Sequence, residues 1–338
     1  MKTRGGFLSL GAGILFSFAA LAGCGGRDRA DVELLNVSYD PTREFYTEFN
    51  RAFARHWEEQ TGRTVSVAQS HGGSGRQARA VIDGIPADVV TLALAADVDA
   101  IARAGLLPAD WQTRLPENSA PYRSTLAFLV RQGNPRNIRD WADLARNDVS
   151  VITPNPKTSG VARWNYLAAW GWAEREYGGD EEKILGYIRS LYRNVPVLDT
   201  AARGATTTFI ERRIGDVLIN WENELLLALR ERGEAFEIVV PSVSILAEPT
   251  VALVDRNVDR RGTRAVAEAY LEFLYSDTAQ EMAARHFYRP SRPEFGEKYA
   301  ARFPEIELFT IDEAFGGWAP VMEKHFRDGG VFDRIYLR

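Results

Sequence analysis

The sequence contains a single cysteine, Cys24, and only four histidines among its 338 residues. One cysteine excludes a disulfide framework and a zinc site built from cysteines. The histidines are too scattered along the chain to form a metal-binding motif. The net charge is also small, because 41 Lys and Arg face 46 Asp and Glu. A mildly acidic chain lacks the positive surface that binds nucleic acid or anionic lipid, so we expect no metal, no cofactor and no nucleic-acid partner.

Long hydrophobic runs are absent too, and a short one lies at the N-terminus. Residues 1–23 combine two positive charges with an apolar stretch from Phe7 to Leu21. This stretch is shorter than a membrane span and is typical of an export signal. Its end, Leu21–Cys24, resembles a bacterial lipobox, which implies a lipoprotein signal peptide over 1–23 and lipidation of Cys24, with a short tether over 24–30. Ordinary cleavage that leaves Cys24 as a free thiol is the alternative.

The rest of the chain alternates short apolar segments with amphipathic ones. This alternation predicts an α/β fold with a largely parallel sheet, and the length after residue 23 indicates two domains. Pro and aromatic residues after Tyr288 indicate a segment that wraps the surface. We predict strands over 33–39, 64–70, 87–93, 125–131, 149–153, 195–199, 216–220, 236–241 and 250–255. We predict helices from Asp40 to about residue 61 and around 76–83, 98–102, 141–145, 164–172, 182–191, 209–210 and 264–274.

Loops of small residues recur where a predicted strand gives way to a helix, after Ser70, Pro156 and Asp199. A helix start exposes amide donors that have no intrahelical partner, and it can bind an anion without a cationic side chain. Taken singly, each of these loops is explained as a common turn between a strand and a helix. None has the spacing of a P-loop or of a dinucleotide-binding fingerprint. Their spread over both halves of the chain suits one small anion held between two lobes.

One of these loops has a specific sequence. Asn155–Arg163 reads NPKTSGVAR and resembles the signature of bacterial periplasmic sulfate-binding proteins. That family comprises the solute receptors of sulfate and thiosulfate ABC importers. The resemblance covers nearly all of the chain after the predicted signal peptide, and it continues through LLNVSYDPTR (34–43), QSHGGSGRQ (69–77), ADVVTLALA (87–95), ARGA (202–205), WENE (221–224), ILAEPTV (245–251) and FTIDEAFGGW (309–318).

The resemblance implies a two-lobed periplasmic-binding-protein architecture of type II. Each lobe would be a mixed, mostly parallel sheet flanked by helices, with the ligand in the cleft between the lobes. We expect lobe one to contain 31–120 plus 252–338 and lobe two to contain 121–251. The chain would cross between them near 125–131 and 245–251, and the lobes would close by hinge bending.

The resemblance also implies a binding site made of neutral donors. Val161 stands where many relatives have glycine, and its β-branched side chain restricts the local dihedral angles. The donors would be the backbone amides of Asp40, Gly160, Val161 and Ala202, the hydroxyls of Ser74 and Ser159, and the indole N–H of Trp221. We expect the Asp40 carboxylate to cap its own helix, and Lys157, Arg163 and Arg203 to support the loops without touching the ligand.

Donors alone suit sulfate, which carries no proton at neutral pH, whereas phosphate needs an acceptor for its proton. The chain is therefore predicted to be a binding protein and not an enzyme. The resemblance implies a monomeric receptor in the periplasm, anchored by lipid, that delivers sulfate to a membrane permease with an ATPase.

Three alternatives remain at this point. Thiosulfate could be the main ligand, since no residue separates the two anions. An exported hydrolase could use Ser74 or Ser159, although His71 has no partner to orient it. A structural or adhesive lipoprotein would not need donor loops in both halves. Glu222 and Glu224 could pass for a catalytic pair, but their spacing favours solvated or structural roles.

Overall fold

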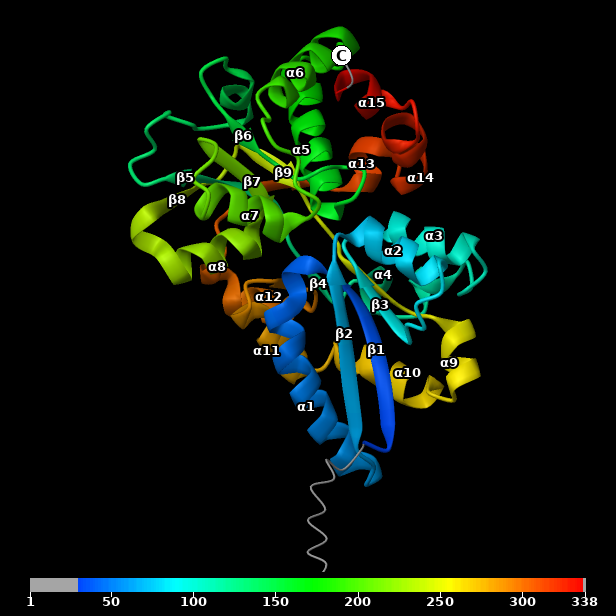
Figure 1. Ribbon diagram of the computed structural model, residues 1–338. Coiled ribbons are helices and arrows are strands. Elements are labelled where there is room, and N and C mark those ends of the chain that lie inside the picture. Colours follow the sequence, from blue (N-terminus) through cyan, green and yellow to red (C-terminus); the bar gives the residue numbers. More distant parts are fainter. Residues whose placement is uncertain (1–29, 337–338) are drawn as a thin grey trace, which may run out of the picture.

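The computed structural model describes residues 30–336 and has two lobes (Figure 1). The predicted signal peptide, Cys24 and all of the predicted tether except Ala30 lie outside the described residues. Among residues 30–336, no helix is both long and apolar enough to cross a bilayer.

Lobe one is built on a four-stranded sheet in the order β10-β3-β1-β2. β1 is parallel to both β2 and β3, and only β10 is antiparallel, as predicted for a mostly parallel sheet. The strands are β1 (Val32–Tyr39), β2 (Val65–Gly72), β3 (Val89–Leu92) and β10 (Thr250–Leu253). The flanking helices are α1 (Arg43–Thr61), α2 (Ser74–Ile82), α3 (Ala95–Arg103), α9 (Asp255–Arg261), α10 (Arg264–Phe273), α11 (Asp277–Arg285) and α12 (Pro293–Tyr299).

The aromatic stripe of α1 faces the core of this lobe, as its four-residue spacing predicts. Phe45, Phe49 and Phe53 are buried. The Phe49 and Phe53 rings meet Tyr270 of α10 edge to face, at 5.0 and 5.1 Å between ring centroids. This packing fixes α1 against the sheet, and with it the loop at the carboxyl end of β1.

Lobe two contains a second four-stranded sheet in the order β6-β7-β5-β8. Here the prediction of a mostly parallel sheet is wrong, because β5 is antiparallel to both of its neighbours and only β6 and β7 are parallel. β5 comes directly from the segment between the lobes, with no crossover helix to reverse its direction. The strands are β5 (Leu126–Arg131), β6 (Val151–Ile152), β7 (Val217–Trp221) and β8 (Phe236–Val239), and the helices are η3 (Trp141–Ala145), α5 (Gly160–Glu176), α6 (Glu181–Arg193), α7 (Ala202–Ile210) and α8 (Glu222–Arg232).

The predicted strand over 195–199 does not form, and this segment is irregular. Pro196 lies within it and has no N–H to give to a ladder. The segment instead accepts a hydrogen bond at the Asp199 carbonyl from the Asn155 amide, at 2.8 Å. It therefore supports the NPKTSG loop without belonging to a sheet.

Two chain segments cross between the lobes side by side. Ser124 and Ala247 exchange backbone hydrogen bonds of 2.9 Å, and the Thr125 hydroxyl donates to the Ile245 carbonyl at 2.9 Å. Just before this crossing, β4 (Tyr122–Arg123) pairs with β11 (Arg289–Pro290) in lobe one. A paired double crossing of this kind is the arrangement about which two lobes can rotate.

The C-terminal segment differs from the prediction. Only its first part stays with lobe one, because β12 (Glu307–Phe309) pairs with β9 (Val243–Ile245) beside α5. The assignment of all of 252–338 to lobe one is therefore wrong for the final elements, which form a third crossing and do not simply wrap the surface. Phe326 and Phe332 are buried against Tyr166 of α5. These elements are α13 (Ile311–Phe315), α14 (Trp318–Val321), the π-helical turn η6 (Met322–Phe326) and α15 (Val331–Tyr336).

Candidate functional site

All of the sequence-predicted ligand residues lie around one small cavity between the lobes. The cavity has a volume of about 10 Å³, counted as the space that the centre of a water molecule can reach. This is room for about one water molecule. The lining residues are Tyr39, Asp40, Pro41, Gly72, Gly73, Ser74, Ala93, Ser159, Gly160, Val161, Ala201, Ala202 and Trp221.

Four helix N-termini meet at this cavity: those of the 3₁₀ helix η1 (Asp40–Thr42), α2, α5 and α7. The residues at their N-cap positions are Tyr39, Gly73, Ser159 and Ala201, and none of them makes a side-chain capping bond. The first amides of these helices therefore have neither an intrahelical acceptor nor a cap from their own loop. The dipoles of all four helices add positive potential at the same point.

Two side-chain donors add to these amides. Ser159 is 3% exposed and Trp221 1% exposed. Within residues 30–336, neither the Ser159 hydroxyl nor the Trp221 indole N–H makes a hydrogen bond to the protein. Trp221 ends β7, and its ring packs against Tyr39 of lobe one at 5.8 Å between centroids. Both groups are held in place with their protons available.

Ser74 departs from the prediction that its hydroxyl is free to donate to a ligand. Its hydroxyl donates to Asp97 Oδ2 at 2.6 Å and accepts from the Ala93 amide at 3.0 Å. The hydroxyl proton is therefore already used in this arrangement, while the uncapped start of α2 still presents the backbone amide of Ser74. Sequence reasoning missed Asp97, which lies 23 residues further on in the first turn of α3.

The Asp40 carboxylate does not cap its own helix, contrary to the prediction. One oxygen accepts from Arg43 Nη2 at 3.2 Å, and the other accepts from the backbone N–H of Arg203 at 3.3 Å. Arg203 is the second residue of α7, so Asp40 caps a helix of the opposite lobe. The N-cap of α7 is an alanine and has no oxygen of its own for this purpose.

Two glycines allow the lobes to come this close. A Cβ atom on Gly73 would lie 2.5 Å from the Thr158 carbonyl oxygen, and one on Gly160 would lie 2.4 Å from Ala93 Cβ. Val161 follows Gly160 within α5 and is not among the described residues with positive φ, so its β-branched side chain causes no strain there. The small residues serve contact between the lobes as much as access for a ligand.

The charged groups around the cavity pair with one another, as predicted for Lys157, Arg163 and Arg203. Arg163 Nη1 reaches Asp97 Oδ1 at 2.7 Å, which joins α5 to α3 across the cleft. Lys157 Nζ reaches Asp333 at 2.9 Å and the carbonyl oxygens of Phe326 and Arg327, each at 3.2 Å. None of these cations lines the cavity.

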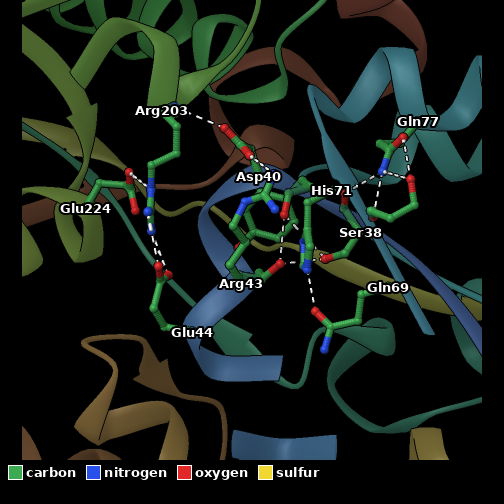
Figure 2. Close-up of polar contacts among 12 residues, drawn as sticks. Ser38, Asp40, Arg43, Glu44, Gln69, His71, Gln77, Arg203 and Glu224 are labelled. Atoms are coloured by element: carbon green, nitrogen blue, oxygen red, sulfur yellow. Dashed lines mark hydrogen bonds and ion pairs between the residues drawn. The ribbon is translucent and has the colours of Figure 1, made fainter. Parts of the chain in front are cut away.

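Arg203 forms a second link between the lobes (Figure 2). It lies 2.6 Å from Glu44 of lobe one and 2.7 Å from Glu224 of lobe two. Glu222 makes two bonds of 2.7 Å to Arg289. Because Glu222 and Glu224 are both buried, the solvated role considered for them is wrong and the structural one is confirmed.

Burial gives Glu224 unusual proton affinity. Desolvation raises its pKa to about 7, Arg203 opposes this shift, and the charges of Glu44 and Asp40 add to it. The Oε1 atom of Glu224 has no hydrogen-bond partner among the described residues. Glu224 is thus a carboxyl group between the lobes that changes charge close to neutral pH.

Ser74 has no histidine as a hydrogen-bond partner among the described residues. The Ser74 hydroxyl faces a carboxylate that Arg163 already pairs, and His71 contacts the Gln69 side chain instead (Figure 2). Burial and the nearby Arg43 lower the pKa of His71. Among residues 30–336, no group of three or more His, Cys, Asp or Glu side chains is placed to hold a metal ion. The arrangement can surround a small anion with neutral donors.

Comparison with known proteins gives a consistent result. Residues 37–289 match the family described as bacterial extracellular solute-binding protein. The chain is 58% identical over 329 residues to the "Sulfate-binding protein" of Escherichia coli K12, covering 97% of this chain and 99% of that one. It is 51% identical over 327 residues to the "Thiosulfate-binding protein" of Pseudomonas aeruginosa, covering 95% and 98%.

The fold is also similar to that of a solved relative. The sulfate-binding protein SubI of Mycobacterium tuberculosis matches with a TM-score of 0.78 and 32% identity, over 86% of this chain and 98% of that one. The periplasmic binding protein AfuA of Actinobacillus pleuropneumoniae matches with a TM-score of 0.57 at 17% identity, which supports the fold alone.

Proposed function

This chain belongs to the family of bacterial extracellular solute-binding proteins, and we propose that it captures sulfate between its two lobes for import into the cell. The observation that carries the proposal is the cavity itself. Four helix N-termini without caps of their own, the Ser159 hydroxyl and the Trp221 indole converge there, and no cationic side chain lines it. The names of the relatives from E. coli and M. tuberculosis point to the same ligand.

Energetics favour a fully deprotonated anion. Enclosing a dianion costs several kcal/mol of hydration free energy, and each hydrogen bond to a charged group returns about 1.5–3 kcal/mol. About seven donors then leave a net affinity in the micromolar range or tighter after the cost of association. Hydrogen phosphate keeps a proton that needs an acceptor, and the acceptor oxygens of Asp40 are already bound to Arg43 and to α7.

Calorimetric titration with sulfate, thiosulfate, phosphate and molybdate tests the proposal. We expect sulfate to bind with micromolar or lower Kd and phosphate to bind at least about a hundredfold more weakly, because its proton would remain without a partner. Equal affinity for phosphate and sulfate, or no binding of either, would refute the donor-only site.

Thiosulfate is the second candidate. The relative from P. aeruginosa carries that name, and thiosulfate presents nearly the same demand for donors. The ratio of the two dissociation constants in the same titration decides between them. A thiosulfate affinity more than about tenfold above that of sulfate would make thiosulfate the main ligand.

The proposal extends to the site of action. Residues 1–23 would direct export, and lipidated Cys24 would hold a monomeric receptor at the membrane on its periplasmic side. There the closed form would dock on a permease powered by an ATPase. Mass spectrometry of the protein from membranes tests the anchor, since an unmodified thiol at Cys24 would contradict it. The proposed role is binding without catalysis, and covalent labelling of Ser74 or Ser159 by a serine-hydrolase probe would contradict that.

A further inference from the structure

The C-terminal segment from β12 onward (307–336) belongs to lobe two but also reaches lobe one. Part of its sequence, FTIDEAFGGW over 309–318, carries the resemblance to sulfate-binding proteins, yet none of these residues lines the anion cavity. β12 joins lobe two by pairing with β9, whereas α14 packs on α3 of lobe one. In Figure 1, α14 lies directly above α3. This contact between the lobes is therefore separate from contact with a ligand.

One tryptophan packs on both lobes at this contact. Trp318 begins α14 and packs against the hydrophobic core of lobe one, which contains Val98 and Ile101 of α3. It also packs against the core around α5, where its ring meets Trp164 edge to face at 4.7 Å between centroids. Among residues 30–336, Trp318 is the one partly buried hydrophobic side chain that packs on both of these cores. Its ring therefore lies in the interface between the lobes.

The local sequence fixes where this ring points. Thr310 and Glu313 form a capping box that starts α13. The helix is followed by Gly316 and Gly317, whose φ angles of 69° and 98° are both positive. Gly317 combines its φ of 98° with a ψ of −178°, a conformation that is essentially restricted to glycine. The chain therefore leaves α13 in a direction set by this glycine turn, and Trp318 is the next residue.

The attachment of the C-terminal segment to lobe two is stronger than its contact with lobe one. Phe326 and Phe332 are buried in the core around α5, and Lys157 pairs with Asp333 at 2.9 Å. Trp318 is only partly buried. Because hydrophobic stabilisation grows with the apolar area removed from water, the contact of Trp318 with α3 is the one that breaks when the lobes part.

We propose that Trp318 is a clamp between the lobes: the C-terminal segment attaches it to lobe two, and its ring holds α3 of lobe one while the lobes are closed. Trp318 does not touch the bound anion and acts as a positioning residue. A contact that stabilises the closed state slows the opening that must precede release of an enclosed ligand. The effect on anion release rests on the function proposed above, whereas the effect on closure does not.

Stopped-flow tryptophan fluorescence at a series of sulfate concentrations measures the rate constants of association and dissociation. In Trp318→Ala we expect dissociation to accelerate about 5- to 50-fold, while association changes by less than about threefold. Trp318→Phe keeps an aromatic ring and should recover most of the slow dissociation. Phe315→Ala is the matched control, because Phe315 is partly buried in the same segment and packs, within residues 30–336, on the core around α5 alone. It should leave both rate constants within about twofold.

Small-angle X-ray scattering without sulfate tests closure by itself. We expect a larger radius of gyration in Trp318→Ala than in the parent protein, and the parent value in Trp318→Phe and Phe315→Ala. Urea unfolding of the same samples shows whether each variant is folded. Gly317→Ala keeps the ring but disfavours the turn that directs it, so it should also expand the protein and accelerate sulfate dissociation, and it carries the test if Trp318→Ala does not fold.

The outcomes separate the clamp from the proposed function. An unchanged dissociation rate and radius of gyration in folded Trp318→Ala would overturn the clamp, as would equal acceleration in Phe315→Ala. If the parent protein fails to bind sulfate while Trp318→Ala still expands relative to it, the proposed function fails and the clamp stands. If all variants bind sulfate with the parent rates, the clamp fails and the proposed function stands.

Discussion

The two lobes supply different kinds of donor to the anion cavity. Around the anion cavity, the groups available to a ligand are hydrogen-bond donors, and most of them are backbone amides at helix N-termini. Lobe one presents backbone amides at the starts of η1 and α2, whereas lobe two adds the Ser159 hydroxyl and the Trp221 indole N–H to the amides of α5 and α7. A site made of backbone is fixed by the fold, whereas a site made of side chains can change by single substitutions.

The charged side chains of the two lobes complement each other. Near the anion cavity the cations are present but paired, so Arg163 and Arg203 link the lobes without reaching the cavity. Lobe one contributes Asp97 and Glu44 to these ion pairs, and lobe two contributes the two arginines and Glu224. The anion cavity is therefore surrounded by charges that are already paired, and what it offers an anion is the direction of its hydrogen-bond donors.

The largest loss of sulfate affinity is expected from a substitution that places a negative charge in the anion cavity. Ser159→Asp places a carboxylate against the bound anion, and like charges in contact cost several kcal/mol. We expect sulfate affinity to fall by more than about a thousandfold in calorimetric titration. Ser159→Ala is the control, because it removes one donor and should cost about 10- to 150-fold. An unchanged affinity in Ser159→Asp would show that Ser159 is not in the site.

Preventing the close approach of the lobes is expected to have the next largest effect. Gly160→Ala puts a methyl group 2.4 Å from Ala93 Cβ, and overpacking of this kind costs about 1–3 kcal/mol. Sulfate affinity should fall about 5- to 150-fold. Gly186→Ala on α6 meets no atom within 4 Å and is the matched control, with full affinity and slightly raised stability. Equal sulfate affinities in Gly160→Ala and Gly186→Ala would show that binding does not depend on this close approach of the lobes.

The buried Glu224 predicts how stability changes with pH. Because its pKa is raised to about 7, the folded state holds a proton that the unfolded state releases near its ordinary pKa of 4.5. The free energy of unfolding should therefore decrease as pH rises through the interval between those values. In Glu224→Gln this decrease should shrink by about 1–3 kcal/mol, measured by urea unfolding at pH 5 and pH 7.5. If the free energy of unfolding of Glu224→Gln changed with pH as much as that of the parent protein, the raised pKa of Glu224 would be contradicted.

The smallest effect on binding is expected where a side chain changes and the backbone does not. Val161→Ala leaves the amide of the first turn of α5 in place. Sulfate affinity should stay within about threefold, while the loss of buried methyl groups lowers stability by about 1–3 kcal/mol. Calorimetric titration measures the change in sulfate affinity, and thermal unfolding of the same sample measures the change in stability. A large loss of affinity at unchanged stability would mean that the Val161 side chain itself shapes the site.

Much of lobe one could be predicted from sequence because its signals are local. The stripe of Phe45, Phe49 and Phe53 defines α1, and small residues after each strand mark the helix starts that meet at the cavity. The resemblance to sulfate-binding proteins implied that Ser159, Ala202 and Trp221 share one site, and the structure brings them together around one cavity.

The features that sequence could not predict depend on pairing between distant segments. The direction of β5, the attachment of the final helices to lobe two through β12, and the capping of α7 by Asp40 all join residues more than 60 positions apart. Asp97 was missed for the same reason, since an acid in a helix shows no sign of the serine and arginine that it will contact. Local patterns specify elements, and packing specifies their partners.

The cap that Asp40 gives to α7 makes one amide proton a reporter of lobe movement. When the lobes are together, the Arg203 N–H is bonded to a carboxylate of the other lobe, and when they part it meets solvent. Its rate of exchange with deuterium should therefore follow how often the lobes come apart, while amides in the middle of α7 exchange only when the helix itself opens. Deuterium exchange at this one amide therefore measures how often the lobes open, without an attached dye.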